Sequence, residues 1–432
     1  MNFLKKLFSP TFLTISLLLL FYTFYRSEIT YSGDKRNYYL TYYILSFLLI
    51  FFSIVTFFIS YKIKEYMIII SFSLLISLYL FEGYLTVDLN DKYQLYEKET
   101  GKKWDKRLPY EIYDDLRKEN NEIVITARAT LHENKNNPIF SIAGISNSKT
   151  IHCNENGYYS IYQSDRYGFN NPDIEWDSNQ IEFLLVGDSY THGSCVNRPN
   201  DIGSVLRTLS NKSVLNLGYR GNGPLVEYIT LREYLTPKVK KVLWIFSAND
   251  LYNLENEMNA EILKNYLNDI SFTQNLRLKQ KEIDTNLKIF LKSYEERLKK
   301  LEKKSILKEF IKIYNIRNLI LKKEEEAAAA STEEFKKVIR LAKDLTKKNN
   351  SKLYFVYLPG YARYVNKVDI NKTYISVKNI TEELGIPFID IHKEVFENKE
   401  NLLDFFPFEQ NGHYNINGYS KVGQTIYNFA KD

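Results

Sequence analysis

Residues 181–193 read IEFLLVGDSYTHG, and this stretch decides the fold. Its apolar residues run straight into Gly-Asp-Ser, and Gly193 closes the stretch four residues after Ser189. A short apolar run that ends in turn-forming residues is typical of a strand buried in a sheet. We therefore expect Ser189 to stand where a buried strand ends and the chain turns sharply. Enzymes hold nucleophiles at such turns, although every α/β protein also has turns there.

Apolar strands alternate with amphipathic helices along the rest of the C-terminal region. Strands are predicted over 181–189, 213–218, 240–250, 351–359 and 386–391. Helices are predicted over 201–211, 224–235, 332–349, 374–385 and 416–431. This alternation predicts a parallel sheet covered by helices on both faces, which is a three-layer αβα fold of the flavodoxin-like type. Ligands bind beyond the carboxyl ends of the strands in such sheets, and Ser189, Gly221 and Asn249 follow such ends.

The first 86 residues are far more apolar than the rest of the chain. The stretches 7–25, 38–61 and 66–81 carry no charge. A membrane helix needs about 20 predominantly apolar residues, so we predict a membrane anchor of three transmembrane helices within 1–86. A signal peptide is the alternative for the first stretch, but no small-residue cleavage site follows it.

Basic residues indicate how these spans are oriented. Lys5 and Lys6 precede the first span, and Lys62 and Lys64 lie between the second and the third. Basic residues favour the cytoplasmic side, which predicts a cytoplasmic N-terminus in the cell (inner) membrane. Since three spans put the two ends of the chain on opposite sides, everything after about residue 86 is predicted to be extracytoplasmic.

Composition divides the remainder into an extension, a catalytic domain and an insertion. Residues 87–180 are polar and irregular, and we expect them to pack as an extension on a domain formed by 181–432. Within that domain, 254–330 is rich in Lys, Glu, Leu and Ile, which predicts one or two long helices. We interpret this insertion as solvated helices, with a lid or a partner-docking arm as the alternative.

The overall charge and the short motifs argue against several classes of partner. Lys and Arg number 58 against 52 Asp and Glu, and the resulting net charge of +6 comes without a basic face of interleaved aromatic residues. Nucleic acid is therefore not expected as a partner. The sequence shows no metal-ligand spacing, and its glycine-containing loops lack a phosphate-loop Lys, so we predict no metal and no cofactor.

The predicted strand ends carry the groups that acyl transfer requires. A serine hydroxyl needs a base to become nucleophilic, and it needs donors to hold the oxyanion that forms. The loop GYRGNGP (218–224) has glycines that let a backbone N–H point into a site, and Asn249 supplies an amide donor. His413, which precedes the last predicted helix, is the candidate base.

Four short blocks carry a resemblance to a known family. GDSYTHG, NLGYRGNGP, SAND and NGHYNINGY occur in this order and resemble the four blocks of the SGNH (GDSL-type) hydrolase superfamily. The resemblance covers about 180–253 and 332–432. The stretch CNENGYY…SDRYGFNNP, which precedes the first block, is similar to membrane-anchored bacterial members of that superfamily.

The resemblance implies a role for each matching residue. Ser189 would be the nucleophile and His413 the general base. The backbone N–H groups of Ser189 and Gly221, together with the Asn249 side chain, would form the oxyanion hole. The family usually carries an Asp two or three residues before the His, where this chain has Asn411 and Gln410.

The missing Asp leaves the acid of the triad open. Asp404 or Glu409 would supply it, or Asn411 would orient the imidazole. In a further alternative, a backbone carbonyl would orient the imidazole, and a Ser-His dyad would operate without an acid. The two cysteines, Cys153 and Cys195, are either two buried thiols or a disulfide that pins the loop around Cys153 beside the active site.

These features support three functions. The first is a membrane-anchored, extracytoplasmic serine esterase that removes acyl groups, with acetyl expected, from a carbohydrate or cell-envelope polymer. The second is an O-acyltransferase that acylates a surface polysaccharide beside a membrane-bound acyltransferase partner. The third is a catalytically inactive glycan-binding module, which the missing Asp favours and intact Ser189, Asn249 and His413 oppose. The lipid bilayer is the expected partner of the N-terminal helices.

Overall fold

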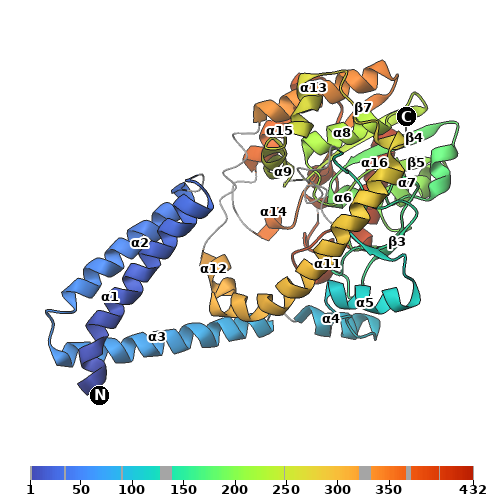
Figure 1. Cartoon of the computed structure of the whole chain (residues 1–432). Coiled ribbons are helices and arrows are strands. Elements are labelled where there is room, and N and C mark those ends of the chain that lie inside the picture. The colour runs from blue at the N-terminus through green and yellow to red at the C-terminus, as the bar shows by residue number, and fades with distance from the viewer. Residues whose placement is uncertain are drawn as a thin grey trace. The chain divides into compact units, whose positions relative to one another are not determined.

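The structure is a computed structural model. It describes residues 2–33, 36–88, 91–126, 139–247, 249–320, 332–365, 371–397 and 399–431. By its internal contacts the chain divides into two compact units (Figure 1). One consists of Met1–Asp88 with Leu307–Lys322, and the other of Leu89–Ile306 with Lys323–Asp432.

The first unit holds the apolar helices. They are α1 (Asn2–Phe24), continued by a π-helical turn η1 (Tyr25–Thr30), α2 (Arg36–Val55) and α3 (Tyr61–Asp88), accompanied by the short α12 (Tyr314–Ile320). Three spans are long and apolar enough to cross a membrane, namely Lys5–Thr30, Tyr38–Val55 and Tyr61–Thr86. The helices α1 and α2 lie antiparallel and side by side (Figure 1), and an ion pair of 2.6 Å joins Lys5 to Glu65. These spans match the three predicted membrane helices.

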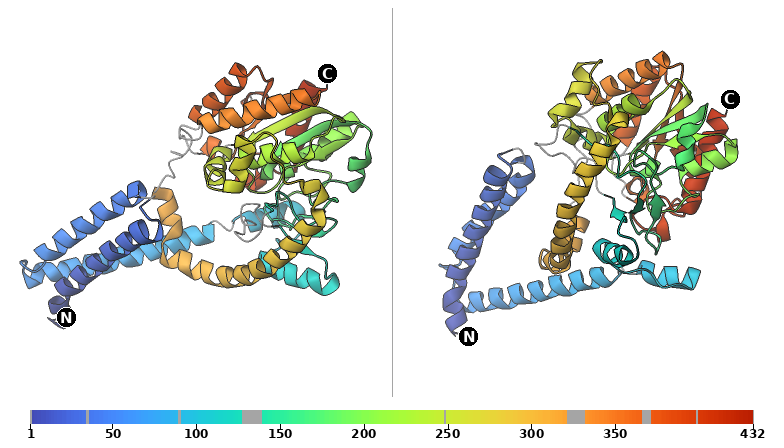
Figure 2. Two further views of the ribbon diagram at one scale, coloured as in Figure 1. Left: turned by 45° about the horizontal axis from the view of Figure 1, so that its top comes forward. Right: turned by 45° about the vertical axis from the view of Figure 1, so that its right-hand side comes forward.

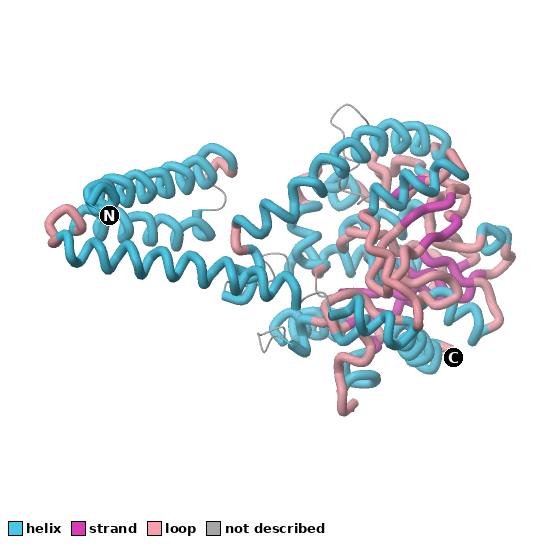
Figure 3. Tube along the Cα trace, turned by 90° about the horizontal axis from the view of Figure 1, so that it is seen from below, coloured by secondary structure: helices cyan, strands magenta, loops and turns pink. Residues whose placement is uncertain are grey.

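A parallel five-stranded sheet forms the centre of the second unit. Its strands are β4 (Ile181–Gly187), β5 (Val214–Asn216), β6 (Val239–Ser247), β7 (Lys352–Leu358) and β8 (Phe388–Asp390). The strand order is β5-β4-β6-β7-β8, which is the flavodoxin-like order 2-1-3-4-5. Figure 3 shows strands in magenta among the cyan helices. The predicted parallel sheet is therefore confirmed.

Helices cover both faces of this sheet, because successive side chains of a strand point to opposite sides. Leu184 and Val186 of β4 belong to one apolar cluster, and Phe183 and Leu185 belong to the other. The first cluster includes side chains of α8 (Pro224–Tyr234), α13 (Thr332–Lys348) and α15 (Asn371–Glu383). The second includes side chains of α7 (Ile202–Ser210) and α16 (Ile416–Ala430). The predicted three-layer αβα fold is thus present (Figure 2).

The segment before β4 forms a layer tied to the sheet by hydrogen bonds. It contains α4 (Asp91–Thr100), α5 (Pro109–Glu119), a 3-10 turn η3 (Asp173–Asp177) and a small sheet of β1 (Val124–Ile125), β2 (Lys149–Ile151) and β3 (Ile161–Gln163). Buried Asp165 accepts hydrogen bonds from the Nδ2 of Asn171 and the Nε1 of Trp176. The same Asn171 amide donates to the carbonyl of Asn216 in β5 at 2.9 Å.

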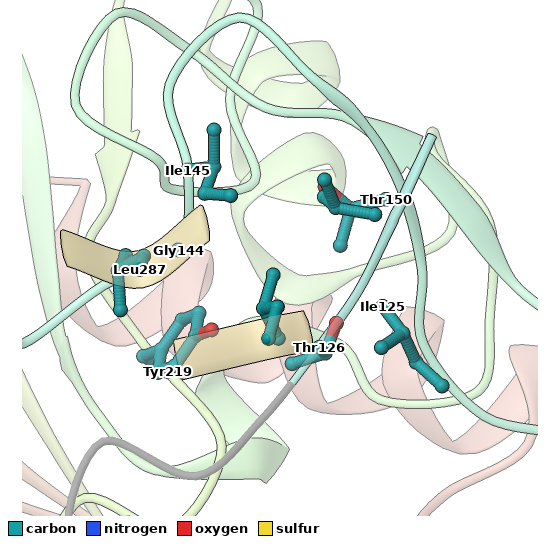
Figure 4. A pocket seen from close by; sticks show the side chains of 9 residues that line it. Ile125, Thr126, Gly144, Ile145, Thr150, Tyr219 and Leu287 are labelled. Carbon is teal, nitrogen blue, oxygen red and sulfur yellow. The ribbon is translucent and has the colours of Figure 1, made fainter. Parts of the chain in front are cut away.

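The insertion packs more closely than a solvated arm would. Its elements are α9 (Asp250–Glu257), α10 (Glu261–Asn268), a 3-10 turn η4 (Leu276–Leu278) and the 32-residue α11 (Gln280–Ile311). Ile283, Leu287 and Leu291 of α11 are buried in the main apolar cluster. A hollow beside Leu287 and Tyr219 holds about 10 Å³, the lower limit for one water molecule (Figure 4). One side of the first half of α11 therefore belongs to the core, while its other sides, including Lys288 and Ile289, are exposed to solvent.

Gly187, at the end of β4, is the residue on which the turn before Ser189 depends. Its φ is +157°, and an added Cβ would lie 2.0 Å from Thr191 Oγ1 and 2.6 Å from the carbonyl oxygen of Ile245. We expect Gly187→Ala to lower the free energy of unfolding by more than about 2 kcal/mol, because the side chain would force β4 and β6 apart. Thermal or denaturant unfolding of the detergent-solubilised protein measures this.

Gly101→Ala is the matched control. Gly101 also has a positive φ, +69°, but nothing lies within 4 Å of its added Cβ. Only backbone strain acts there, so we expect a loss of about 1 kcal/mol. Equal losses for the two variants would contradict the steric explanation.

Candidate active site

Ser189 lies at the point where the sheet changes direction. The chain leaves β4 toward β5 on one side, and later adds β6 on the other side of β4. In open α/β sheets the crevice for ligands forms at this switch point, beyond the carboxyl ends of the strands. Ser189 opens the short helix α6 (Ser189–His192) directly after β4, and Asn249 directly precedes α9 after β6. The sheet therefore brings together these two predicted residues.

His413 reaches the hydroxyl of Ser189 from the loop before α16. The Nε2 of His413 lies 2.9 Å from Ser189 Oγ. The Nδ1 of His413 lies 3.0 Å and 3.1 Å from the two carboxylate oxygens of Glu155. A proton on Nδ1 donates to Glu155 and leaves the Nε2 lone pair for the serine proton. The backbone N–H of His413 donates to Glu155 Oε2 at 2.6 Å, so this carboxylate fixes both the ring and its loop.

Glu155 corrects the predicted source of the acid. Asp404 and Glu409 are exposed. The carboxylate of Asp404 pairs with Lys399 at 2.8 Å, and that of Glu409 accepts from the Nδ2 of Asn401 at 2.8 Å. Asn411 is an exposed residue of the loop that carries His413. The imidazole is therefore oriented by a carboxylate from the layer before β4, and not by Asp404, Glu409 or Asn411.

Two of the proposed oxyanion donors, Ser189 and Asn249, are joined through the carboxylate of Asp188. Asp188 Oδ2 lies 3.3 Å from Ser189 Oγ and accepts a hydrogen bond from the Nδ2 of Asn249 at 3.2 Å. The hydroxyl of Ser247 donates to Asn249 Oδ1 at 2.7 Å, which turns the Nδ2 toward Asp188 and Ser189. Gly221 has a φ of +80° in its loop, and within the described residues no acceptor is found for its N–H. Asn249 is exposed, so its amide is open to a substrate.

Charge tunes the imidazole in the direction that base catalysis needs. Burial lowers the pKa of His413, but the charge of Glu155 and their hydrogen bond outweigh burial and raise this pKa above its ordinary value. Burial likewise raises the pKa of Glu155, and the charge and hydrogen bonds of His413 outweigh it and lower that pKa. Arg220, beside Gly221, acts on His413 in the opposite sense and lowers its pKa. The pair thus favours imidazolium with carboxylate.

A disulfide between Cys153 and Cys195 holds the segment that carries Glu155. The two cysteines therefore form a disulfide and are not two separate buried thiols. The amide of Asn156 adds a hydrogen bond of 2.9 Å to the carbonyl of Cys195. The carboxylate of Glu155, the Sγ of Cys195 and the imidazole of His413 all lie within 4.8 Å of one another. Because the sulfur of Cys195 is bonded to Cys153, it is not free to act as a thiolate ligand for a metal.

A second Ser-His pair lies in the interior behind the site. The Nε2 of His152 is 2.7 Å from Ser194 Oγ, and the rings of His152 and His192 are 4.4 Å apart. Burial lowers the pKa of both histidines, for His192 to about 4. Ser194 is only 1% exposed. This pair is inaccessible to substrate, and His192 is 1% exposed.

Buried carboxyl groups lie beneath the proposed oxyanion hole. Glu257 accepts hydrogen bonds from the backbone N–H groups of Gly223 and Leu225 at 2.6 Å and 3.0 Å, and so anchors the loop that presents Gly221. Burial raises the pKa of Glu257 to about 8. Burial and the charge of Asp188 also raise the pKa of Asp250 well above its usual range. With its pKa raised in this way, Glu257 is protonated at neutral pH and carries no charge that would repel a developing oxyanion.

The fold and the geometry can now be compared with known proteins. No protein-family model and no curated protein matches the sequence. Among solved structures, the matches include proteins of the lipolytic G-D-S-L family. One, from Desulfitobacterium hafniense DCB-2, is 14% identical, with 58% of this chain and 99% of that chain covered and a TM-score of 0.34. Another, from Veillonella parvula DSM 2008, is 12% identical, with 57% and 97% covered and a TM-score of 0.34.

A further match is the acetyl xylan esterase AlAXEase. It is 13% identical, with 58% of this chain and 99% of that chain covered and a TM-score of 0.34. The family of the first two structures is the one that the four sequence blocks resemble. The roles proposed below rest on the geometry of the site and not on these likenesses.

Replacing Glu155 tests its relation to His413. In Glu155→Gln the negative charge is lost, so the imidazolium is less stable and the pKa of His413 falls. We expect the acidic limb of the kcat/KM–pH profile to move to lower pH, with a loss of activity of about 10²–10⁴-fold at its plateau. Ester hydrolysis measured across the pH range reports both effects.

Asp404→Asn and Glu409→Gln are the matched controls, because they remove the other two candidate acids. Both are expected to keep the rate and the pH profile of the unsubstituted protein. A large loss in either control, with Glu155→Gln unaffected, would show that the acid lies elsewhere.

Breaking the disulfide is expected to act through Glu155. The chain contains only two cysteines, so a reductant acts on this bond alone, and alkylation should succeed only after reduction. Freeing the loop displaces the carboxylate, and a shift of about 1 Å can cost up to about 100-fold in kcat/KM. The Cys153→Ser, Cys195→Ser double variant should show the same loss and be insensitive to reductant. Full activity in the reduced protein would disprove this coupling.

Proposed function

We propose that this chain is a membrane-anchored serine esterase whose nucleophile is Ser189, whose general base is His413 and whose acid is Glu155. One observation carries the proposal. A serine hydroxyl at the switch point of the sheet lies 2.9 Å from an imidazole nitrogen, and the other nitrogen of that ring lies 3.0 Å from a carboxylate. Such an arrangement serves nucleophilic catalysis of acyl transfer.

In the first half of the reaction, the Oγ of Ser189 attacks the carbonyl carbon of an ester while its proton passes to the Nε2 of His413. The carbonyl oxygen becomes an oxyanion, held by the N–H groups of Ser189 and Gly221 and by the amide of Asn249. Loss of one such donor typically costs about 10²–10³-fold in rate. Glu155 stabilises the imidazolium, which then gives its proton to the leaving alcohol. The acyl group remains on Ser189.

In the second half, water takes the place of the alcohol. The neutral His413 accepts a proton from this water, which attacks the acyl-enzyme carbonyl through a second oxyanion. Collapse of that intermediate releases the carboxylic acid and returns the proton from His413 to Ser189 Oγ. The proton that leaves with the alcohol came from Ser189, and the proton that restores Ser189 comes from water, so His413 acts as base and then as acid in each half. Because each half forms an oxyanion, the donors of the oxyanion hole serve twice.

We place the catalytic unit outside the cytoplasm, and we propose acyl groups, acetyl in the first place, on a carbohydrate or envelope polymer as the substrate. Disulfides persist in oxidising compartments, and the Cys153–Cys195 bond supports such a location. Attachment to the membrane by apolar helices suits a polymer made or held there.

The geometry bears against an inactive glycan-binding module. That alternative drew its support from the absence of Asp before His413. Glu155 provides the carboxylate that the imidazole lacks in its own loop.

The decisive experiment compares the full-length protein with Ser189→Ala in detergent, using p-nitrophenyl acetate as substrate. The full chain is needed because Leu307–Lys322 belongs with the apolar helices. We expect Ser189→Ala to lose at least about 10³-fold in kcat, and a fluorophosphonate probe to label Ser189 but not buried Ser194. Ser271→Ala, at an exposed serine, is the control.

Two outcomes would count against the esterase. The absence of both hydrolysis and labelling would indicate an inactive module. Transfer of acetyl to an added oligosaccharide in preference to water, abolished by Ser189→Ala, would identify an O-acyltransferase.

A further inference from the structure

A buried carboxylate near the end of the third apolar helix has a partner far away in the sequence. Glu82 lies in the span Tyr61–Thr86 and is 0% exposed. Its two carboxylate oxygens accept the backbone N–H groups of Asn315 and Ile316, each at 3.0 Å. An ionisable side chain within an apolar span is costly unless it is paired, so this contact explains why the span tolerates Glu82.

The partner is a chain reversal at the far end of the insertion. Helix α11 ends at Ile311 and α12 begins at Tyr314, with Ile313 between them at a φ of +46°. A β-branched residue in the left-handed region is strained, and such strain persists only where the surroundings impose it. Isoleucine cannot cap the N-terminus of α12, and the carboxylate of Glu82 supplies that cap from another helix.

Further contacts fasten this reversal, residues 308–317, which we call the elbow. The hydroxyl of Tyr79 donates to the carbonyl of Ile311 at 2.9 Å, and the Nδ2 of Asn315 donates to Thr86 Oγ1 at 3.1 Å. The rings of Tyr79 and Phe310 are 5.5 Å apart. All of these residues belong to the first compact unit.

The outward side of the elbow has the composition of a membrane interface. Ile311 is 57% exposed and Tyr314 is 45% exposed, with the exposed Lys308 and Lys312 beside them. Apolar and tyrosyl side chains that alternate with lysines are typical of segments lying at the boundary between headgroups and acyl chains. Apolar residues of α3 near Glu82 are exposed as well; they are Leu80, Phe81 and Tyr84.

We propose that the elbow is a second membrane attachment of the catalytic chain, seated on the end of α3 and inserted into the lipid interface. The span Tyr61–Thr86 has 26 residues, where about 20 cross the hydrocarbon core. Residues 79–86 therefore lie where the span leaves the hydrocarbon. Ile311 and Tyr314 contact acyl chains there, and Lys308 and Lys312 contact anionic headgroups. This inference does not depend on the proposed reaction.

A cleavable full-length protein tests the attachment. A protease site is inserted between Asp88 and Asp91, and the protein is cut in membrane vesicles containing anionic lipid. With the covalent link to α3 severed, we expect the fragment 91–432 to sediment with the membranes, because the elbow holds it. Recovery of the fragment 91–432 in the supernatant, free of membranes, would overturn the proposal.

Two variants of the same cleavable protein test separately the contact of the elbow with α3 and its contact with lipid. Glu82→Leu keeps the span apolar but removes the cap, and Ile311→Ser with Tyr314→Ser removes the lipid-facing side chains. Both should release the fragment after cleavage. Ile289→Ser, at a 66% exposed position of α11 outside the elbow, should not.

Direct contact with lipid is measured with Tyr314→Trp. We expect brominated lipids to quench the fluorescence added by this tryptophan, whereas a tryptophan placed at Ile289 should not be quenched. This substitution is conservative, so the measurement remains informative if the other variants fold poorly. Retention of the fragment without quenching would mean that the elbow binds only α3, which would contradict insertion into lipid.

Discussion

The carboxylate of Glu155 forms hydrogen bonds with His413 at two points, its ring Nδ1 and its backbone N–H. Everything else in the proposed mechanism depends on these hydrogen bonds, because an imidazole in a loop is otherwise free to turn away from Ser189. The hydrogen bond to Nδ1 also sets the tautomer that leaves Nε2 ready to accept a proton. Glu155 in turn depends on the layer before β4, which the Cys153–Cys195 bond ties to the loop after α6. A covalent bond and two hydrogen bonds thus define the geometry of a reacting pair.

The sheet supplies the other half of that geometry. Its strand order places the ends of β4 and β6 side by side, and Asp188 gathers the groups that follow them. One oxygen of this buried carboxylate accepts from the amide of Asn249 and lies within hydrogen-bond distance of the hydroxyls of Ser189 and Ser247. The N–H of Tyr190 donates to the other oxygen of Asp188, so this carboxylate stabilises the turn after β4. It also aligns the amide that is proposed to meet the oxyanion.

Much of this fold could be read from the sequence because its signals are local. A buried parallel strand is a short apolar run, and the covering helices repeat their apolar residues with helical spacing. Ser189, Asn249 and His413 could be proposed as site residues because each directly follows a strand or precedes a helix in a recognisable block. Glu155 was missed because an acid that reaches a histidine 258 residues later leaves no local pattern. One signal did exist: the cysteine six residues after Ser189 pointed to the loop around Cys153, and Glu155 is an acid of that loop.

The insertion was also only partly predictable from the sequence. Its helical nature followed from composition, but burial of Leu287 against the core and the docking of the elbow on α3 are tertiary contacts. Amphipathic Lys- and Leu-rich sequence describes a solvated helix, a packed helix and a membrane-interface segment equally well. Glu82 is an acid in an apolar span, and such a residue needs a partner.

The position of Glu155 ahead of β4 has a consequence for how this protein can change over generations. The sheet and its helices hold the serine and the imidazole, while the carboxylate belongs to the preceding segment. Recombination that joins a foreign segment at the first strand of the sheet would remove the proposed acid, Glu155, together with the apolar side chains that the preceding layer adds to the main cluster. The layer before the sheet and the sheet itself must therefore be inherited as a single block.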